Sequence, residues 1–189
     1  TVLANLSHPN LPRVIDHFII PTRGQYLVMD YVAGDDLERI LTGREVIPVD
    51  EALRWIIQVV EGLDYLHRQQ PPIFHRDVKP ANIRITPQDQ AMLVDFGLVK
   101  VFDPHVNTTQ GARAITPGYA PPEQYGRGGT DARTDIYGLG ATLYMLVTGH
   151  EPLESVRRMA GEHLPSAHSV NPAVPLPLSD VIERAMTLD

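Results

Sequence analysis

The chain has 189 residues and a formal charge of −7, from 16 lysines and arginines against 23 aspartates and glutamates. This acidic balance argues against a general nucleic-acid binder, because such a protein needs clustered Lys and Arg to release counterions. The chain has no cysteine, which excludes disulfides, thiol catalysis and cysteine-based zinc sites. No apolar run approaches the roughly eighteen residues of a membrane helix, and the first residues do not resemble a secretion signal. The composition, 43% hydrophobic and 21% charged, suits one globular domain or part of a larger one.

The first part of the chain is predicted to contain a helix end, a β-hairpin and a short helix. Residues 3–10 indicate the end of a helix that runs into a Pro-Asn turn. Two β-branched runs follow, Val14 to Ile20 and Tyr26 to Val32, with Pro21-Thr22-Arg23-Gly24 between them. This pattern is typical of strand, turn and strand. Residues 35–41 then predict a short helix with acids in its first turn.

A longer helix and a second hairpin are expected next. Asp50 to His67 follows the breaker Pro48 and predicts a helix capped by Asp50. Its apolar residues at helical spacing are Leu53, Ile56, Ile57, Val60 and Leu63. Residues 82–85 and 91–94 predict two strands around a polar turn.

The second half is predicted to contain a long loop and two more helices. Residues 103–130 have little periodicity and indicate a loop, and loops of this length are usually functional. Residues 134–147 are apolar on nearly every side and end before Gly149, so they predict a buried helix. The Pro-rich segment 165–177 suits the surface, and residues 179–186 predict a last helix capped by Ser179.

One group of residues suggests a chemical site. His75-Arg76-Asp77-Val78-Lys79-Pro80-Ala81-Asn82 precedes the second hairpin, and Asp95-Phe96-Gly97 follows it. Because a hairpin returns the chain on itself, Asp77, Asn82 and Asp95 are expected to share a site. One carboxylate and one amide suffice for Mg²⁺, which completes its shell with phosphate and water. A second carboxylate can orient a hydroxyl nucleophile, and a lysine can offset charge on a transferred phosphoryl group. These are the groups that phosphoryl transfer needs.

At these residues the chain resembles the eukaryotic-type, or Hanks-type, serine/threonine protein kinases, whose H-R-D and D-F-G motifs it matches. Met29 to Val32 resembles the hinge that receives adenine. Thr116 to Glu123 resembles the end of the activation segment, and Asp135 to Gly140 resembles the buried helix that supports the catalytic loop. Lys79, two residues after Asp77, matches the serine/threonine pattern. The resemblance implies an α+β, protein-kinase-like fold of bacterial type, with a mainly helical large lobe and a remnant of the small-lobe sheet.

The resemblance also implies catalytic and metal-binding roles. Asp77 is expected to orient the substrate hydroxyl, and Lys79 to contact the γ-phosphate of ATP. Asn82 and Asp95 are expected to hold Mg²⁺. Thr116 is expected to belong to the same catalytic group.

A nucleotide site is implied beside it. Met29, Asp30 and Val32 belong to the hinge, and the last two offer backbone groups to adenine. Asp36 matches the acidic position that reaches the ribose. Arg84 stands where the family usually has an apolar residue beneath adenine, so its aliphatic stem, or some repacking, is expected to supply that floor.

Two acidic residues are expected to be structural. The resemblance implies that Glu123 pairs with an arginine near the end of the domain. It also implies that Asp135 hydrogen-bonds the backbone of the catalytic loop.

A phosphorylation switch is a further expectation. In the family, an arginine at the position of Arg76 marks kinases whose activation loop is ordered by a phosphate. Arg76 and Lys100 are therefore expected to bind a phosphate on Thr108 or Thr109.

The resemblance covers nearly the whole chain but not a whole kinase domain. The sequence has no G-x-G-x-x-G loop, and the family's strand lysine and helix glutamate would precede Thr1. We therefore expect a fragment that is truncated at both ends. Residues 1–32 would form a partial small lobe with the hinge, and residues 33–189 the large lobe.

The implied function is transfer of the γ-phosphate of ATP to serine or threonine of a protein substrate, as part of signal transduction. This is expected for the complete protein, in the cytoplasm, with the fragment alone inactive. A homodimer for trans-autophosphorylation and a membrane anchor elsewhere in the protein are compatible with it. One alternative is a pseudokinase or a nucleotide- or protein-binding module, which the missing first half favours for this chain by itself. A second is a small-molecule phosphotransferase of the aminoglycoside-kinase type, which lacks a segment like Thr116 to Glu123.

Overall fold

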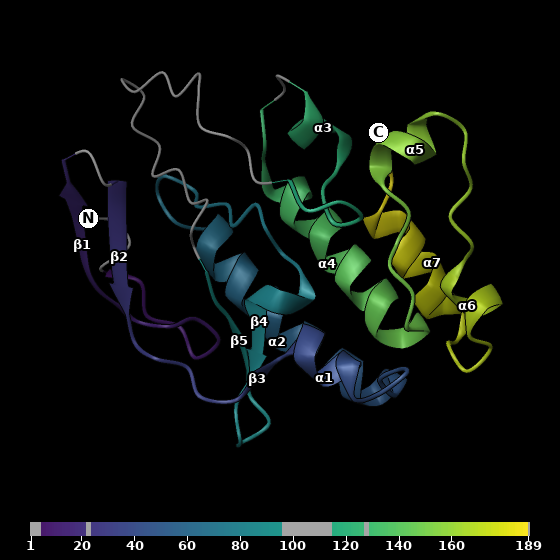
Figure 1. The fold of residues 1–189 in the computed structure, drawn as a ribbon, viewed down its shortest axis with the longest axis horizontal. Helices are drawn as coiled ribbons and strands as arrows, with labels where there is room; N and C mark the ends of the chain where they lie inside the picture. The colour runs from purple at the N-terminus through teal and green to yellow at the C-terminus, as the bar shows by residue number, and fades with distance from the viewer. Residues whose placement is uncertain (1–4, 22–23, 96–114, 127–128, 189) are drawn as a thin grey trace.

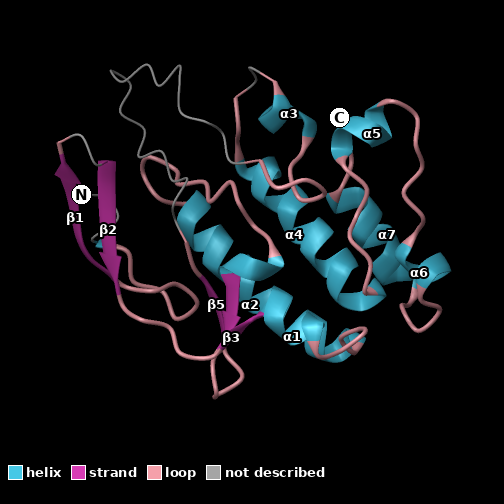
Figure 2. Ribbon diagram, in the orientation of Figure 1, coloured by secondary structure: helices cyan, strands magenta, loops and turns pink. Residues whose placement is uncertain are grey.

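The structure is a computed structural model that describes residues 5–21, 24–95, 115–126 and 129–188. A two-stranded hairpin lies at one end, a small sheet lies in the middle, and a helical body makes up the rest (Figure 1, Figure 2). The described helices include none with both the length and the apolar character needed to cross a membrane. The arrangement confirms the predicted α+β class with a mainly helical large part.

The elements follow one another in a simple order. The strands are β1 (Val14–Ile20), β2 (Gly24–Met29), β3 (Asp35–Asp36), β4 (Ile83–Ile85) and β5 (Ala91–Leu93). The α-helices are α1 (Leu37–Thr42), α2 (Val49–His67), α3 (Pro122–Tyr125), α4 (Ala132–Thr148), α5 (Ser155–Met159), α6 (Ala167–Val170) and α7 (Leu176–Ala185). A 3-10 helix, η2, covers Pro80–Asn82.

The first hairpin confirms the predicted strand pair. Strands β1 and β2 are antiparallel, with Ile20 opposite Gly24 and Val14 opposite Met29. The second strand ends at Met29, so the prediction that it continues to Val32 is wrong. The backbone N–H of the next residue, Asp30, donates to the carbonyl of Arg13 (2.9 Å), and the chain then leaves the hairpin toward the helical body.

Residues 30–34, the linking segment, connect the first hairpin to a small sheet, which also contains the second hairpin. Its strand order is β3-β4-β5, and all neighbours are antiparallel. Residues 35 and 36 form β3, so the helix predicted from residue 35 begins only at Leu37, with Asp36 as its N-cap. Gly34 enters the sheet with φ of 108°, and a Cβ at this position would lie 1.9 Å from the carbonyl oxygen of Ile85. Only glycine fits this approach of two backbones.

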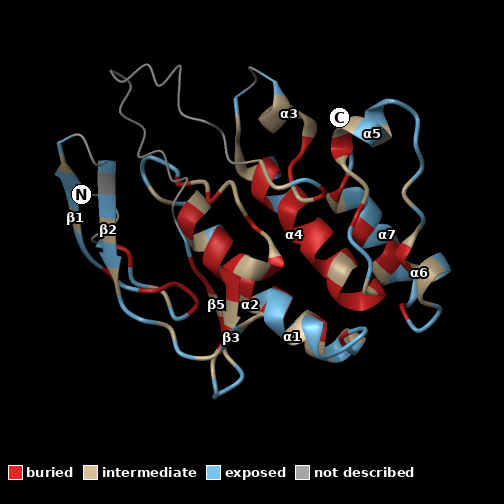
Figure 3. Ribbon diagram, in the orientation of Figure 1, coloured by how far each residue is buried: buried red, intermediate tan, exposed pale blue. Residues whose placement is uncertain are grey.

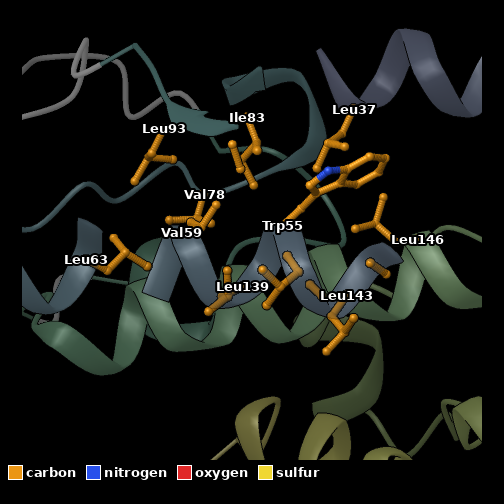
Figure 4. Close-up of a cluster of buried hydrophobic side chains, with 14 of the residues drawn as sticks. Leu37, Trp55, Val59, Leu63, Val78, Ile83, Leu93, Leu139, Leu143 and Leu146 are labelled. Carbon is orange, nitrogen blue, oxygen red and sulfur yellow. The ribbon is translucent and has the colours of Figure 1, made fainter. Parts of the chain in front are cut away.

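The core lies between α2, α4 and the inner face of the small sheet (Figure 3, Figure 4). The indole of Trp55 is directed toward Leu37, and Val59 lies beside Val78, with Leu139 and Leu143 of α4 beneath them and Ile83 of β4 above (Figure 4). Each fully buried leucine or valine of this kind contributes about 1.5–3 kcal/mol to folding.

The predicted face and cap of α2 need correction. Ile57 and Val60 are exposed, while Ala52, Trp55 and Val59 form the buried stripe instead. The helix packs against both α4 and β5. The spacing of the apolar residues predicts a helix, but it does not show which of them face these two neighbours. Pro48 is the N-cap residue and makes no side-chain cap, so Asp50 lies in the first turn.

The C-terminal part confirms the predicted buried helix, but the last helix begins earlier in the chain than predicted. Helix α4 is buried on nearly every side, as predicted, and ends at Gly149. The last helix begins at Leu176, three residues before Ser179. Ser179 is therefore not a cap; it is buried inside α7, where its hydroxyl accepts a hydrogen bond from the backbone N–H of His168 (3.2 Å).

Two helix-ending glycines provide a matched test of this fold. Gly149 has φ of 71°, and a Cβ there would lie 2.2 Å from the carbonyl oxygen of Glu45, whereas Gly43 ends α1 with φ of −94°, and a Cβ there would make only an ordinary 3.7 Å contact with the carbonyl oxygen of Ile40. We expect Gly149→Ala to lower the free energy of unfolding by about 1–3 kcal/mol or more, and Gly43→Ala to change it by less than about 1 kcal/mol. Urea denaturation of both variants measures this. Equal stability of the two would contradict the role given to Gly149.

Candidate functional site

The segment from His75 to Asn82 is held from below by one buried carboxylate. Asp135 of α4 is fully buried, and its oxygens accept the backbone N–H groups of His75 (2.9 Å) and Arg76 (2.6 Å). The ring Nε2 of His67, at the end of α2, lies 2.8 Å from the same carboxylate. The expectation that Asp135 hydrogen-bonds this loop is confirmed by these distances.

This support holds an uncommon backbone conformation. Arg76 has φ of 67°, which costs free energy for a residue with a side chain. Its N–H is bound by Asp135, and its carbonyl accepts a hydrogen bond from the side-chain amide of Gln124 (2.7 Å). The turn sets the direction of the next side chain, Asp77.

Four side chains of the predicted site form one hydrogen-bonded group. Lys79 Nζ lies 2.9 Å from Asp77 Oδ2 and donates to Thr116 Oγ1 at 2.9 Å. The Thr116 hydroxyl donates to Asp77 Oδ1 (2.9 Å), and the Asn82 amide nitrogen donates to Asp77 Oδ2 (2.8 Å). The Asp77 and Lys79 side chains are 16% and 23% exposed, so solvent and a ligand can reach them. Thr116 joins them from 37 residues away in the chain.

The second hairpin brings Asp95 to this group. Strands β4 and β5 pair, and the N–H of Val94 donates to the carbonyl of Asn82 (2.8 Å). The ring of His75 lies 3.0 Å from the Val94 carbonyl. Asp95 follows directly, exposed and with φ of 62°. The backbone of the hairpin therefore returns to Asn82 one residue before Asp95, and a site shared by Asp77, Asn82 and Asp95 stays a prediction.

Asn82 and Asp95 offer hard oxygen ligands on neighbouring chain segments. The amide nitrogen of Asn82 is used by Asp77, donating to its side chain and to its backbone carbonyl (2.7 Å), so the amide oxygen lies on the opposite side. A carboxylate and an amide oxygen fit Mg²⁺, which prefers such ligands and keeps several waters.

The predicted nucleotide-binding residues lie around the small sheet and the linking segment. Met29 ends β2, and Asp30 and Val32 follow it. Asp36 pairs with Arg84 across β3 and β4, while its carboxylate caps α1 by accepting the N–H of Arg39 (2.8 Å). The linking segment therefore enters the sheet at Asp35, which lies opposite Ile85. Ile85 is three residues beyond Asn82, the last residue of the 3-10 helix.

The segment after residue 115 packs beside the catalytic group. The N–H groups of Tyr119 and Ala120 both donate to the carbonyl of Thr116. Burial raises the pKa of the Tyr119 phenol, so this ring remains neutral. Glu123 accepts a hydrogen bond from the hydroxyl of Thr134 (2.8 Å). The expected switch residues Lys100, Thr108 and Thr109 lie outside the described residues.

Sequence reasoning missed two residues that position this loop. The sequence predicts His67 only as the end of a helix, and Gln124 lies one residue beyond the motif Thr116 to Glu123. Both act on residues far away in the chain, 68 positions for the His67–Asp135 contact and 48 for Gln124 and Arg76. No local signal in the sequence could have revealed such contacts.

Comparison with known proteins agrees with this geometry. The family model described as protein kinase domain matches residues 1–175. A probable serine/threonine-protein kinase of Clostridium perfringens is 35% identical over all of the chain, and serine/threonine-protein kinase PrkC of Bacillus subtilis is 32% identical over 98% of it. The solved PknI kinase domain of Mycobacterium tuberculosis superimposes on the whole chain with a TM-score of 0.77 and 31% identity.

The chain is shorter than these relatives. It spans 28% of the Clostridium protein and 29% of the Bacillus protein. It also covers 68% of the solved PknI chain and 66% of a solved PpkA chain, to which it is 26% identical with a TM-score of 0.78. The PknI likeness confirms the predicted fold, and the matched relatives are bacterial kinases.

The Asp135 contacts give a prediction for stability. Asp135→Ala removes the acceptor of the buried N–H of His75 and of the partly buried N–H of Arg76, and it removes the partner of His67, so we expect a loss of about 3 kcal/mol or more in unfolding free energy. Asp64→Ala is the matched control, because its ion pair with Arg68 (2.9 Å) is exposed and worth less than about 1 kcal/mol. Hydrogen exchange should also accelerate at the amides of His75 and Arg76. Unchanged exchange at these two amides would contradict the support given to Asp135.

Proposed function

Because the chain belongs to the protein kinase domain family, we propose that the full-length protein that carries it transfers the γ-phosphate of ATP to serine or threonine hydroxyls of protein substrates. The single observation that carries this proposal is the group formed by Asp77, Lys79, Asn82 and Thr116, joined by contacts of 2.8–2.9 Å. The curated relatives are serine/threonine-protein kinases, which supports the choice of substrate hydroxyl.

Each member of the group has a role that its contacts support. Asp77 accepts a hydrogen bond from the Thr116 hydroxyl, and in the reaction it would accept one from the hydroxyl of the substrate and orient that oxygen for attack. Lys79 lies beside the same carboxylate, where its ammonium would offset the negative charge on the transferred phosphoryl group. Thr116 holds both side chains in place, so the geometry exists before the substrate arrives.

Asn82 and Asp95 would hold the Mg²⁺ that accompanies ATP, and the ion would supply charge neutralisation at the phosphates. Asp36 and the backbone of Asp30 and Val32 would bind the nucleoside. The small sheet joins these two sets of residues, because β4 begins directly after Asn82 and pairs with Asp36.

The segment from Thr116 to Glu123 separates this proposal from small-molecule phosphotransfer. It lies against the catalytic group through the contacts of Thr116, and the next residue, Gln124, contacts the loop backbone. A partly buried segment packed beside the catalytic group suits the positioning of an extended peptide, which a small-molecule substrate does not require.

Two carboxylate variants of the full-length protein separate the proposed roles. We expect Asp77→Asn to leave ATP affinity nearly unchanged and to lower kcat by about 10²–10⁴-fold, because it removes the group that orients the hydroxyl. Asp95→Asn should instead weaken Mg²⁺-dependent nucleotide binding. Steady-state phosphotransfer and nucleotide titration with and without Mg²⁺ measure the two effects.

The exposed Asp64→Asn variant is the control and should match the unmodified protein in both assays. If Asp77→Asn abolished nucleotide binding and left kcat intact, the roles would be reversed. Full activity in both site variants would contradict the proposed site and with it the function.

The 189-residue chain alone should be almost inactive. Its sequence contains no G-x-G-x-x-G loop, and positioning with charge stabilisation supplies nearly all catalysis in phosphoryl transfer. Transfer of radiolabelled phosphate to a basic protein measures this, with the full-length protein as the positive control. Turnover by the chain alone near about 1 per second, the lower end of ordinary kinase rates, would overturn the prediction.

A further inference from the structure

The open face of the small sheet carries an arginine between two apolar residues of the same strand. Ile83 and Ile85 point into the core, with 0% and 9% exposure, and Arg84 points to the opposite face. Its cross-strand partners are Asp36 on β3 and Met92 on β5. Directly paired residues share a face, so an acid, a guanidinium and a thioether stand in a row across the sheet.

The guanidinium of Arg84 is held in place, but no carboxylate of the described residues pairs with its charge. Its Nη2 donates to the carbonyl of Gly34, and its Cζ lies 6.0 Å from the centroid of the Tyr31 ring. Its Nε is buried and has no hydrogen-bond partner among the residues that the structure describes. Within those residues it also forms no ion pair, since the carboxylate of Asp36 caps α1 and that of Asp35 pairs with Arg39 (3.3 Å).

A cation in such a place suggests a ligand. Burying part of a charged group without a charged partner costs free energy, which an electron-rich ligand can offset. A guanidinium is planar and weakly hydrated, and it stacks on aromatic faces more readily than an ammonium does. Its distance from the Tyr31 ring shows that an aromatic face already lies within the range of this interaction.

We propose that the Arg84 guanidinium stacks on the purine ring of the bound nucleotide through a cation–π interaction. This inference rests on the proposed function and refines it, because the sequence predicts only the aliphatic stem, or some repacking, as the floor. Arg84 lies two residues beyond Asn82, or about 7 Å along the strand, which separates the base from the metal and phosphates. The bond to Gly34 fixes the guanidinium before the ligand arrives, which reduces the entropy lost on binding.

The test uses adenosine, which has no phosphate charge, as the probe for the full-length protein. Calorimetric titration should give an affinity about five- to thirty-fold weaker for Arg84→Leu, which loses the cation and keeps an apolar side chain. Arg84→Lys should be intermediate, because its ammonium is charged but not planar. Arg39→Leu is the matched control: it removes a nearby exposed guanidinium and should leave the affinity unchanged.

A second probe distinguishes stacking of Arg84 on the purine from a purely structural role of Arg84 through its hydrogen bond to Gly34. Fluorine withdraws electron density from a purine, so the unmodified protein should bind 2-fluoroadenosine about two- to threefold more weakly than adenosine. This preference should vanish in Arg84→Leu if the cation senses the ring. A preference that persists in Arg84→Leu would overturn the inference, whatever the variant does to folding or to the Gly34 bond. Thermal melting of each variant without ligand checks the fold.

Other results would also overturn the proposal. Adenosine affinity in Arg84→Leu equal to or above that of the unmodified protein would mean that the floor is apolar. A loss with ATP but not with adenosine would mean that Arg84 acts only on phosphate charge. Because adenosine binding and phosphotransfer are measured separately, a protein that stacks adenosine on Arg84 but transfers no phosphate would contradict only the proposed function.

Discussion

The carboxylate of Asp135 is the constraint on which the rest of the site depends. It lies fully buried in α4, the most enclosed helix, and it accepts the N–H groups of His75 and Arg76. A buried charge keeps its place only when its oxygens are satisfied, so the loop backbone and the carboxylate stabilise one another. The left-handed turn at Arg76 follows from this, and with it the direction of Asp77. The core between α2 and α4 thereby determines where the reactive carboxylate lies.

The small sheet supplies the second part of the site by a different means. Its inner residues Ile83 and Leu93 are fully buried, so β4 and β5 are fixed from below by packing. The tip of the hairpin is fixed as well, because the indole N–H of Trp55 donates to Asp89 (2.7 Å). Because both the paired strands and the turn between them are held, the end of the hairpin that leads to Asp95 has little freedom to move. Asp95 therefore follows a strand whose register is set by apolar packing and not by the site itself.

The outer face of the same sheet connects the chemistry to the linking segment. Gly34 passes so close to Ile85 that no side chain fits, and its carbonyl receives the guanidinium of Arg84. One three-residue strand thus contributes to the core with two side chains and faces the proposed nucleotide site with the third. The alternation of side chains in a strand makes this division of roles possible.

The sequence by itself determined the motifs, the family, the two hairpins and the long helices α2 and α4, because these depend on local order and on periodic apolar residues. It also predicts that Asp77, Asn82 and Asp95 share a site, since a hairpin must return to its start. Only the tertiary structure decided which face of α2 is buried, where α1 and α7 begin, that Gln124 contacts the loop, and that His67 contacts the supporting carboxylate of Asp135. These features depend on residues that are tens of positions apart and meet only when the helices pack, so no local pattern encodes them. The same reason explains Arg84, whose type is visible in the sequence, whereas its partial burial without an ion pair to any described residue is visible only in the folded chain.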